Sequence, residues 1–585
     1  MPRFVMIIWL AALAVGCRKS PSERFAQLAK EYIDTTLSFS PSLATSVGLH
    51  QYHKQNLDSM LDDVGDQSLD RQKRFYDDFY GRLQALDAKQ LSPEDQADMA
   101  ILQDQCALAR MDFNELHPYL HNPTLYVETL GNALFSPFVL EYAPKTVRYR
   151  QLIARLEQVP LFLDQAALNL TSSPDIWTKV AIQENQGNID LVNQTIRAAM
   201  PQEMAEDYSR AARPALAAMH KFEDYLRNSL ANRDNADWRL GQDRYTRRFR
   251  LVLESGVEAD NTLADAEREL DRVRTQMFDL AMPLHSKMFP DHKEHLTLTG
   301  DPLKNQVIGE VLNKIAERHS TPASFMDDAR KDLDEARAFV QQKHLLTLPA
   351  RSNLEVIPTP DFMRGVYSVG GFDPAPALEP QLGAFYWITP IPTNWPKERI
   401  DSKLREYNFY GLQLLTLHEA IPGHYVQMEI ANNVQPPTRR VLRSILGNNP
   451  YIEGWAVYAT QMMLEEGYLD RSPEMALTFL KHQLRVIANT ILDVRMQMLN
   501  MTDQDAMDLM QNQTFQEKEE ATEKLQRAKL TNCQLPVYFV GWQGWLKLRE
   551  RYRQAKGAAF QLPAFHDAAL REGAVPLPLL EKLLK

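Results

Sequence analysis

Cysteine is scarce in this sequence, which has three residues of this type in 585, at positions 17, 106 and 533. So few cysteines exclude the disulfide framework that stabilises small secreted domains. Neither Cys106 nor Cys533 lies in a cluster with the spacing of a structural zinc site, and their spacing leaves open whether they pair. Stability must come from a hydrophobic core, for which the chain is long enough.

Basic residues are also fewer than acidic residues in this sequence. The formal net charge is -11, and the 65 Lys and Arg residues are not gathered into a block. Nucleic-acid binding needs a basic surface, so this composition argues against DNA or RNA as a partner. The sequence shows no internal repeat or low-complexity tract, and its 44% hydrophobic and 24% charged residues are typical of a globular protein.

Only one long hydrophobic run occurs, the 13 residues from Phe4 to Gly16. As a helix it would be about 20 Å long, whereas the core of a bilayer is about 30 Å thick. The run is therefore typical of a signal peptide, predicted over residues 1–17, and not of a membrane-spanning anchor.

Cys17 directly follows this run, and Leu13-Ala14-Val15-Gly16-Cys17 resembles a bacterial lipobox. In a lipobox the cysteine is acylated and becomes the mature N-terminus. The resemblance implies a protein anchored by lipid at Cys17 to the bacterial cell envelope and facing the periplasm, with no other membrane contact. Because Ala14 replaces a larger aliphatic residue, a soluble periplasmic or secreted protein is the alternative.

The rest of the chain has a helical pattern, with apolar residues at three- and four-residue spacing. The clearest amphipathic segments are residues 204–230, 260–287, 325–345, 401–416, 476–501 and 514–529. Charged runs such as residues 516–520 are predicted to face solvent. We predict a mainly α protein with a short stalk over residues 18–24, an N-terminal helical half over 25–300 and a C-terminal half over 301–585.

Residues 354–396 break the helical pattern, because they are rich in proline, glycine and aromatic residues. Short apolar runs bounded by proline, such as residues 383–390, are typical of edge strands and not of central ones. We predict a small sheet here, just before the motif described next. An edge strand could hold an extended peptide by main-chain hydrogen bonds, and a hairpin that only covers the core is the alternative.

The most informative segment is Leu417-His418-Glu419-Ala420-Ile421-Pro422-Gly423-His424, which brackets a carboxylate between two imidazoles. Neutral imidazole is a preferred zinc ligand, and a Glu directly after the first ligand is suited to take a proton from a zinc-bound water. His418 and His424 are therefore candidate ligands of Zn²⁺, and Glu419 is the candidate general base of a hydrolase.

The two histidines are six residues apart, instead of the four of the common His-Glu-x-x-His motif. Six residues of straight helix turn through roughly 600°, which leaves the rings about 120° apart and unable to share one ion. Pro422 removes an amide donor and Gly423 tolerates unusual dihedral angles, so the segment predicts a break in the helix. An ordinary helix end with two incidental histidines is the alternative.

Glu453 is the candidate for a third ligand, because a catalytic zinc usually has three protein ligands and one open position. Asn449 and Pro450 are typical of an N-cap and a first helical residue, which predicts a helix with Glu453 in its first turn. Gly454 would let another backbone come close. The alternative is that Glu453 only complements the helix dipole.

The segments HEAIPGHYVQ and EGWAVYATQMMLEEGYLD resemble the signature of a large bacterial family, the domain-of-unknown-function 885 family. Members of that family are similar to all-helical metallopeptidases of the gluzincin type. The resemblance extends over roughly residues 25–575 and is most specific between 380 and 545. It implies a large helical architecture with a zinc site, in which His418, His424 and Glu453 are the ligands and Glu419 is the general base.

A later segment, Leu535-Pro536-Val537-Tyr538-Phe539-Val540-Gly541-Trp542, is similar to a family stretch that precedes a final long helix. Tyr538 is a candidate catalytic residue that would donate a hydrogen bond to the oxyanion of the reacting carbonyl. A buried tyrosine whose hydroxyl is satisfied by the protein is the alternative. Residues 489–497 depart from a family pattern of an Arg, then Asp, Gly and His, because only Asp493 corresponds.

Together these features predict a zinc metallopeptidase of the cell envelope that cleaves small peptides by Glu419-assisted attack of a zinc-bound water. Tyr386, Trp387 and Trp455 are predicted to favour apolar side chains in the substrate. The alternatives are a non-catalytic lipoprotein that binds a peptide or a metal, and a metal-dependent hydrolase of other amides or esters. A pure binding protein has no need for Glu419.

Three further histidine pairs are predicted to be surface residues without a metal. They are His50 and His53, His117 and His121, and His292 and His295.

Overall fold

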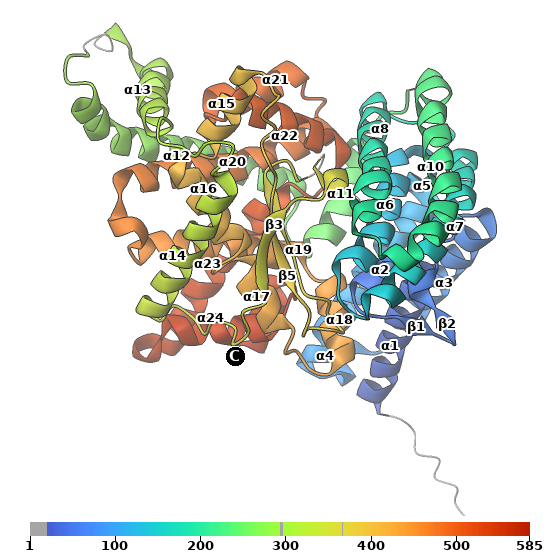
Figure 1. Cartoon of the computed structure of the whole chain (residues 1–585). Coiled ribbons are helices and arrows are strands. Elements are labelled where there is room, and N and C mark those ends of the chain that lie inside the picture. The colour runs from blue at the N-terminus through green and yellow to red at the C-terminus, as the bar shows by residue number, and fades with distance from the viewer. Residues whose placement is uncertain (1–19, 234, 293–296, 365–366) are drawn as a thin grey trace, which may run out of the picture.

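The structure, a computed structural model, describes residues 20–233, 235–292, 297–364 and 367–585. It consists mostly of helices, with one sheet of two strands and one of three (Figure 1). The prediction of a large, mainly α protein with a small sheet is confirmed. Cys17 and the predicted signal peptide lie outside the described residues. No described helix is both long enough and apolar enough to cross a membrane.

The first half of the chain contributes the first twelve of the described α-helices. Its helices are α1 (Pro21–Phe39), α2 (Pro41–Ser46), α3 (Asp66–Gln84), α4 (Pro93–Met111), α5 (Pro118–His121), α6 (Pro123–Val139), α7 (Lys145–Asn169), α8 (Asp175–Asp190), α9 (Arg197–Ala199), α10 (Ala205–Asn228), α11 (Gly241–Leu253) and α12 (Ala259–Met288). The strands β1 (Gln51–Tyr52) and β2 (Gln55–Asn56) form a small hairpin. Ser20 and Glu23 form a reciprocal capping box. The predicted stalk is therefore too long, because α1 already starts at Pro21.

The second half of the chain contributes thirteen of the described α-helices. They are α13 (Gly300–Ile315), α14 (Phe325–Lys343), α15 (Lys397–Glu406), α16 (Phe409–Glu419), α17 (His424–Ala431), α18 (Pro437–Ile445), α19 (Asn449–Glu465), α20 (Pro473–Met498), α21 (Asp503–Asp508), α22 (Lys518–Leu530), α23 (Pro536–Lys556), α24 (Leu562–Arg571) and α25 (Leu577–Leu583).

Four of the six predicted helices correspond to single helices whose bounds agree to within three residues, namely α10, α12, α14 and α20. The predicted segment 401–416 is split between α15 and α16. Asn408 causes the split, because its side chain accepts hydrogen bonds from the backbone N–H groups of Tyr410 and Gly411 and so caps a new helix. The predicted segment 514–529 corresponds to α22, which begins only at Lys518.

The three-stranded sheet lies in the predicted interval and has the order β3 (Leu354–Pro358), β5 (Ala384–Ile388), β4 (Gly370–Asp373). Strand β3 is parallel to β5, and β4 is antiparallel to it. The prediction of edge strands is wrong for β5, which is central and buried along its whole length. Proline occurs only after this strand, so each of its residues keeps an N–H group for the ladder.

Helices from both ends of the chain share the main hydrophobic core. Phe79 of α3 and Ile101 of α4 belong to the same buried cluster as Leu417 of α16. A second cluster lies between α6, α7, α8 and α10, which stand side by side on one flank of the molecule (Figure 1). Cys106 and Cys533 are both buried, and neither forms a disulfide.

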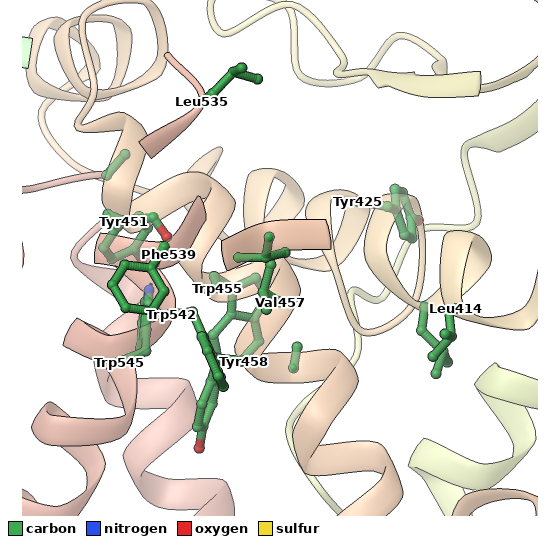
Figure 2. Packing of buried hydrophobic residues seen from close by; sticks show 14 of the residues in the cluster. Leu414, Tyr425, Tyr451, Trp455, Val457, Tyr458, Leu535, Phe539, Trp542 and Trp545 are labelled. Atoms are coloured by element: carbon green, nitrogen blue, oxygen red, sulfur yellow. Dashed lines mark hydrogen bonds between the residues drawn. The ribbon is translucent and has the colours of Figure 1, made fainter. Parts of the chain in front are cut away.

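Helices α19 and α23 cross with their backbones in contact. A Cβ on Gly454 of α19 or on Gly541 of α23 would overlap the backbone of the other helix, which confirms the predicted close approach at Gly454. Figure 2 shows Trp455 and Tyr451 of α19 near Trp545 of α23. The indole N–H of Trp545 donates to the carbonyl of Tyr451 at 2.9 Å. This crossing holds the helix of Glu453 firmly against α23.

Replacement of Gly541 by Ala tests this contact. We expect Gly541→Ala to lower the free energy of unfolding by about 1–3 kcal/mol, because the added methyl group overpacks the crossing. Gly81→Ala is the matched control, since Gly81 lies inside α3 with open space around it. The control should gain roughly 0.5–1 kcal/mol. Denaturant unfolding measures both, and equal stability of Gly541→Ala and the wild type would contradict the close contact.

Candidate metal centre and its cleft

The motif helix ends inside the motif. Helix α16 ends at Glu419 and α17 begins at His424, so residues 420–423 form a break between them. A Cβ on Gly423 would overlap the backbone carbonyl of His418, so this position requires glycine. The predicted break at Pro422 and Gly423 is confirmed.

Glu453 projects from α19, one residue further into the helix than predicted. The side chain of Asn448 accepts a hydrogen bond from the N–H of Tyr451 at 2.8 Å, so Asn448 is the N-cap in place of Asn449. Glu453 is consequently the fifth helical residue. The helix dipole acts mainly within the first turn, so an interaction with the dipole is a poor explanation for a glutamate at this position.

Helix α19 is tied directly to the break between α16 and α17. The indole N–H of Trp455 donates to the carbonyl oxygen of Pro422 at 3.0 Å, and both groups are buried. Because Trp455 lies two residues after Glu453, this bond fixes the distance between the carboxylate and the two histidines.

The three predicted ligands converge on one point. The Nε2 atoms of His418 and His424 each lie 3.4 Å from the same oxygen, Oε2 of Glu453. The candidate ligand atoms of all three residues lie within 4.8 Å of one another. The two imidazole rings are nearly perpendicular, at 83°. Oε2 is buried and has no hydrogen bond of ordinary geometry, so a polar atom without a partner faces both rings.

These groups strongly perturb one another. Burial would raise the pKa of Glu453, but His418 and His424 outweigh burial and hold that pKa well below its usual range. Burial would lower the pKa of His424, but Glu453 raises it to about 9. The carboxylate is therefore ionised even though it is buried, and it faces two imidazoles, which is a donor set that suits zinc.

The second ring nitrogen of His424 has a hydrogen-bond partner outside the three candidate ligands. Nδ1 of His424 lies 3.4 Å from Oε1 of Gln427, and the amide of Gln427 donates to the carbonyl of Tyr451 at 3.4 Å. Such partners fix the ring orientation of metal-binding histidines. Nδ1 of His418 has no hydrogen-bond partner among the described residues.

The three residues open onto a cleft of about 470 Å³. Glu419 lines this cleft and forms no hydrogen bond or ion pair with a described residue, so its carboxylate is free to accept a proton. Strand β4 contributes Gly370 and Phe372 to the wall. The small sheet therefore lies beside the candidate metal centre, as predicted.

Tyr538 lies next to the candidate ligands. Its ring is close to parallel with that of His418, with centroids 6.3 Å apart. Its hydroxyl oxygen accepts a hydrogen bond from Nη2 of Arg527 at 3.2 Å, which leaves its own hydrogen free for the cleft. Burial raises the pKa of Tyr538, so the phenol stays protonated. This geometry suits the predicted role as a hydrogen-bond donor.

Asp493, the residue that corresponds to the family pattern, does not line the cleft. Its carboxylate accepts hydrogen bonds from the hydroxyl of Tyr245 at 2.6 Å and from the N–H groups of Cys533 at 3.0 Å and Leu535 at 3.4 Å. Burial raises the pKa of Asp493 to about 6. The residue anchors the loop that leads into α23 and in this way positions Tyr538.

The predicted aromatic approach to the substrate is wrong. Tyr386 and Trp455 lie in the main core, and Trp387 belongs to a small separate cluster. None of the three lines the cleft, because β5 and α19 are internal elements at these positions. The aromatic residues that do line it are Tyr367, Phe372, Tyr407 and Tyr538.

Helix α20 adds residues to the cleft that sequence reasoning missed, namely Lys481, His482 and Arg485. The ring centroid of His482 lies 6.3 Å from that of His418. Burial keeps the pKa of His482 well below its usual value, so the ring is neutral and can donate a hydrogen bond. The titratable residues at 481, 482 and 485 recur at helical spacing in a segment whose other residues from 477 to 488 are apolar except for Thr478 and Gln483, and this is the signal that could have identified them.

Helix α22 supplies Glu520, Glu523, Lys524 and Arg527 to the same cleft. The prediction that residues 516–520 face solvent is wrong for Gln516, which is buried, and for Glu520, whose side chain is 3% exposed and forms an ion pair with Arg485. Charged residues that recur every three or four positions can face a polar cleft as well as solvent, and the sequence alone does not distinguish the two.

Two of the histidine pairs include residues with acidic partners. Nδ1 of His292 lies 3.2 Å from Oε2 of Glu310, and Nε2 of His285 lies 2.7 Å from the same oxygen. These residues form a second group of possible metal ligands. The prediction of isolated surface histidines is therefore wrong for His292, and also for His50, which is paired with two carboxylates. His295 lies outside the described residues.

Solved bacterial structures share this architecture. One, "a putative lipoprotein of unknown function" from Shewanella oneidensis, is 28% identical over 96% of this chain and 99% of that chain, with a TM-score of 0.75. Another, "the putative lipoprotein from Colwellia psychrerythraea", is 17% identical over 97% and 98% of the two chains, with a TM-score of 0.77, and shows the fold alone. Comparison with curated proteins finds no match.

A family model described as "Bacterial protein of unknown function (DUF885)" matches residues 41–584. The match begins later than the predicted resemblance and extends closer to the C-terminus. It includes the motif break, the helix of Glu453 and the helix of Tyr538. The chain therefore belongs to the DUF885 family of bacterial proteins of unknown function.

Proposed function

We propose that this protein is a zinc-dependent hydrolase of the bacterial cell envelope, a metallopeptidase that cleaves small peptides. The observation that carries the proposal is the position of two Nε2 atoms at 3.4 Å from one buried carboxylate oxygen. The free carboxylate of Glu419 lines the same cleft.

The spacing of the donor atoms suits zinc. Nitrogen and oxygen ligands bind zinc at about 2.0–2.2 Å, and in tetrahedral geometry two such ligands are roughly 3.3–3.6 Å apart. The measured 3.4 Å between each Nε2 and Oε2 of Glu453 lies in this range. Three protein ligands would leave one coordination position open to the cleft, as catalytic zinc sites require.

Each catalytic residue has a defined task in this proposal. Zinc held by His418, His424 and Glu453 would supply a Lewis acid and lower the pKa of a water molecule toward about 7. Glu419 accepts the proton of the attacking water and later delivers it to the leaving amine. Tyr538, the protonated phenol beside His418, donates a hydrogen bond to the developing oxyanion.

The shape of the cleft supports a peptide as substrate. Strand β4 is an edge strand of its sheet and lines the cleft through Gly370 and Phe372. Extended peptides bind such edges through main-chain hydrogen bonds. The cleft volume of about 470 Å³ suits a short peptide better than a folded protein.

The predicted lipid anchor at Cys17 supports an envelope location. The names of both solved relatives include the word lipoprotein. Helix α1 begins at Pro21. Only residues 18–20 separate it from the acylated cysteine, so the anchor would hold the enzyme close to the membrane surface.

Metal analysis tests the ligands. The purified protein is expected to contain about one zinc per chain, and His418→Ala should remove most of it, because two ligands bind zinc far more weakly than three. His220→Ala, which changes an exposed histidine of α10, should retain the metal. Elemental analysis by mass spectrometry gives the content, and stoichiometric zinc in His418→Ala would exclude this ligand set.

Replacement of Glu419 by Gln tests the general base. Gln keeps the shape of the side chain but cannot accept the proton, so peptide hydrolysis should fall by roughly 10²-fold or more while zinc remains bound. Glu398→Gln, at an exposed position of α15, should hydrolyse peptides at the wild-type rate. Unchanged turnover by zinc-loaded Glu419→Gln would assign Glu419 a structural role.

Fractionation of cells tests the anchor. The wild-type protein should be recovered with membranes, and Cys17→Ser should either remain unprocessed or appear in the soluble periplasmic fraction, because the acylated residue is missing. Mass spectrometry of the mature N-terminus identifies the lipid. An unmodified thiol at Cys17 in a wholly soluble wild-type protein would leave simple secretion as the explanation.

A further inference from the structure

The acidic residues of the cleft outside the candidate metal centre already have cationic partners. Three carboxylates are paired, Glu406 with Lys481 at 2.7 Å, Glu523 with Lys403 at 2.6 Å, and Glu520 with Arg485. These pairs cancel most of the charge along this wall. Two basic residues of α22, Lys524 and Arg527, remain outside the pairs.

Lys524 is buried and has no partner. The residue is 5% exposed and lines the cleft, and its ammonium group forms no hydrogen bond or ion pair with any residue in the described part of the chain. Burial, together with the charges of Arg485 and Arg527, holds the pKa of Lys524 well below its usual value. A lysine in such a place costs stability, and an anion bound beside it would restore its favoured charged form.

Arg527 has hydrogen bonds but no carboxylate. Its guanidinium donates to Oε1 of Gln534 at 2.9 Å and to the hydroxyl of Tyr538 at 3.2 Å. It forms no ion pair with a described carboxylate. A guanidinium has five N–H groups, so several remain for a ligand, and their planar arrangement matches a carboxylate.

The two cations lie on the same face of α22, because residues three positions apart on a helix are neighbours. Both line the cleft into which Glu419 also projects. Tyr538 connects them to the candidate metal centre, since it contacts Arg527 on one side and its ring lies 6.3 Å from that of His418 on the other. An anion bound at Lys524 and Arg527 would therefore lie close to the reacting centre.

We propose that Lys524 and Arg527 bind the free C-terminal carboxylate of the peptide substrate, so that the enzyme removes residues from the C-terminal end of short peptides. This inference rests on the proposed peptidase function. A main-chain carboxylate at the end of a short peptide has the charge that this part of the cleft lacks. Bound there, it would align the peptide with the candidate metal centre and determine which peptide bond is cleaved.

Peptides that differ only at the C-terminus test this assignment. A randomised tetrapeptide mixture is prepared with free C-terminal carboxylates and, separately, with C-terminal amides, and is digested by the zinc-loaded wild-type protein. We expect the free acids to disappear roughly 10- to 100-fold faster, the range that corresponds to a charge-assisted hydrogen bond of about 1.5–3 kcal/mol. Mass spectrometry follows both mixtures.

Variants of Lys524 and Arg527 test whether these two residues cause the preference for free acids. In Lys524→Met and Arg527→Met, the ratio of the cleavage rate of the free acids to that of the amides should fall most of the way to one, whatever the change in absolute rate, and Arg527→Lys should retain part of this ratio. Lys529→Met is the matched control on the same helix, because Lys529 lies outside the cleft and pairs with Asp503 at 2.6 Å. Lys524→Met should also be at least as stable as the wild type, because it replaces a buried amine without a partner by an apolar side chain.

A binding measurement separates this inference from the proposed hydrolase. The catalytically impaired Glu419→Gln protein should be stabilised against thermal unfolding more by the free acids than by the amides. If that difference is present but the wild type cleaves nothing, the peptidase proposal fails and the carboxylate site stands. Equal stabilisation by acids and amides would overturn the inference. So would an acid preference that persists in both Met variants, or protection by inorganic phosphate that matches the acids.

Discussion

The candidate metal centre depends on the break between α16 and α17. Histidines six residues apart on a straight helix point in different directions, so no single ion could contact both. Residues 420–423 interrupt the helix. At the end of this break, Gly423 lies so close to the backbone carbonyl of His418 that a Cβ atom would overlap it. The two imidazoles then reach the same oxygen of Glu453. The local backbone geometry at one glycine thus determines whether a three-ligand site exists.

The third ligand requires a different kind of support, because Glu453 belongs to another helix. Helix α19 is fixed to the break by the bond from Trp455 to Pro422 and to α23 by the crossing at Gly454 and Gly541. Because these contacts are buried and involve backbone atoms, they leave the carboxylate little freedom to shift. Precise placement of ligands needs such support from the surrounding core. The same crossing also positions α23, which presents Tyr538 to the cleft.

Much of this centre could be predicted from the sequence, because its signals are local. The break followed from Pro422 and Gly423, and the close helix approach followed from Gly454. The long amphipathic helices were also predictable, except where Asn408 caps a new helix with its side chain. What could not be predicted is which face of a helix meets which neighbour. Trp455 is core and Glu520 is buried, although aromatic content suggested a substrate contact for the first and charge suggested solvent for the second. Strand β5 is central because β3 and β4 pair with its two edges, and this pairing is also not visible in the local sequence.

The distribution of charge in the cleft depends on contacts between residues that are far apart in the sequence. Glu520 and Glu523 lie within one turn of Lys524 on α22 and could have neutralised it, but Arg485 of α20 and Lys403 of α15 engage their carboxylates. The pairing between helices therefore decides which cations remain unpaired. The whole chain carries a formal net charge of -11, so two basic cleft residues without a carboxylate partner among the described residues are an exception to the overall balance. In a cleft with low-dielectric walls, such an exception acts on a bound ligand far more strongly than an exposed lysine would. The fold thus places an orienting charge beside a candidate reacting centre, and neither the composition nor the motif of this chain indicates it.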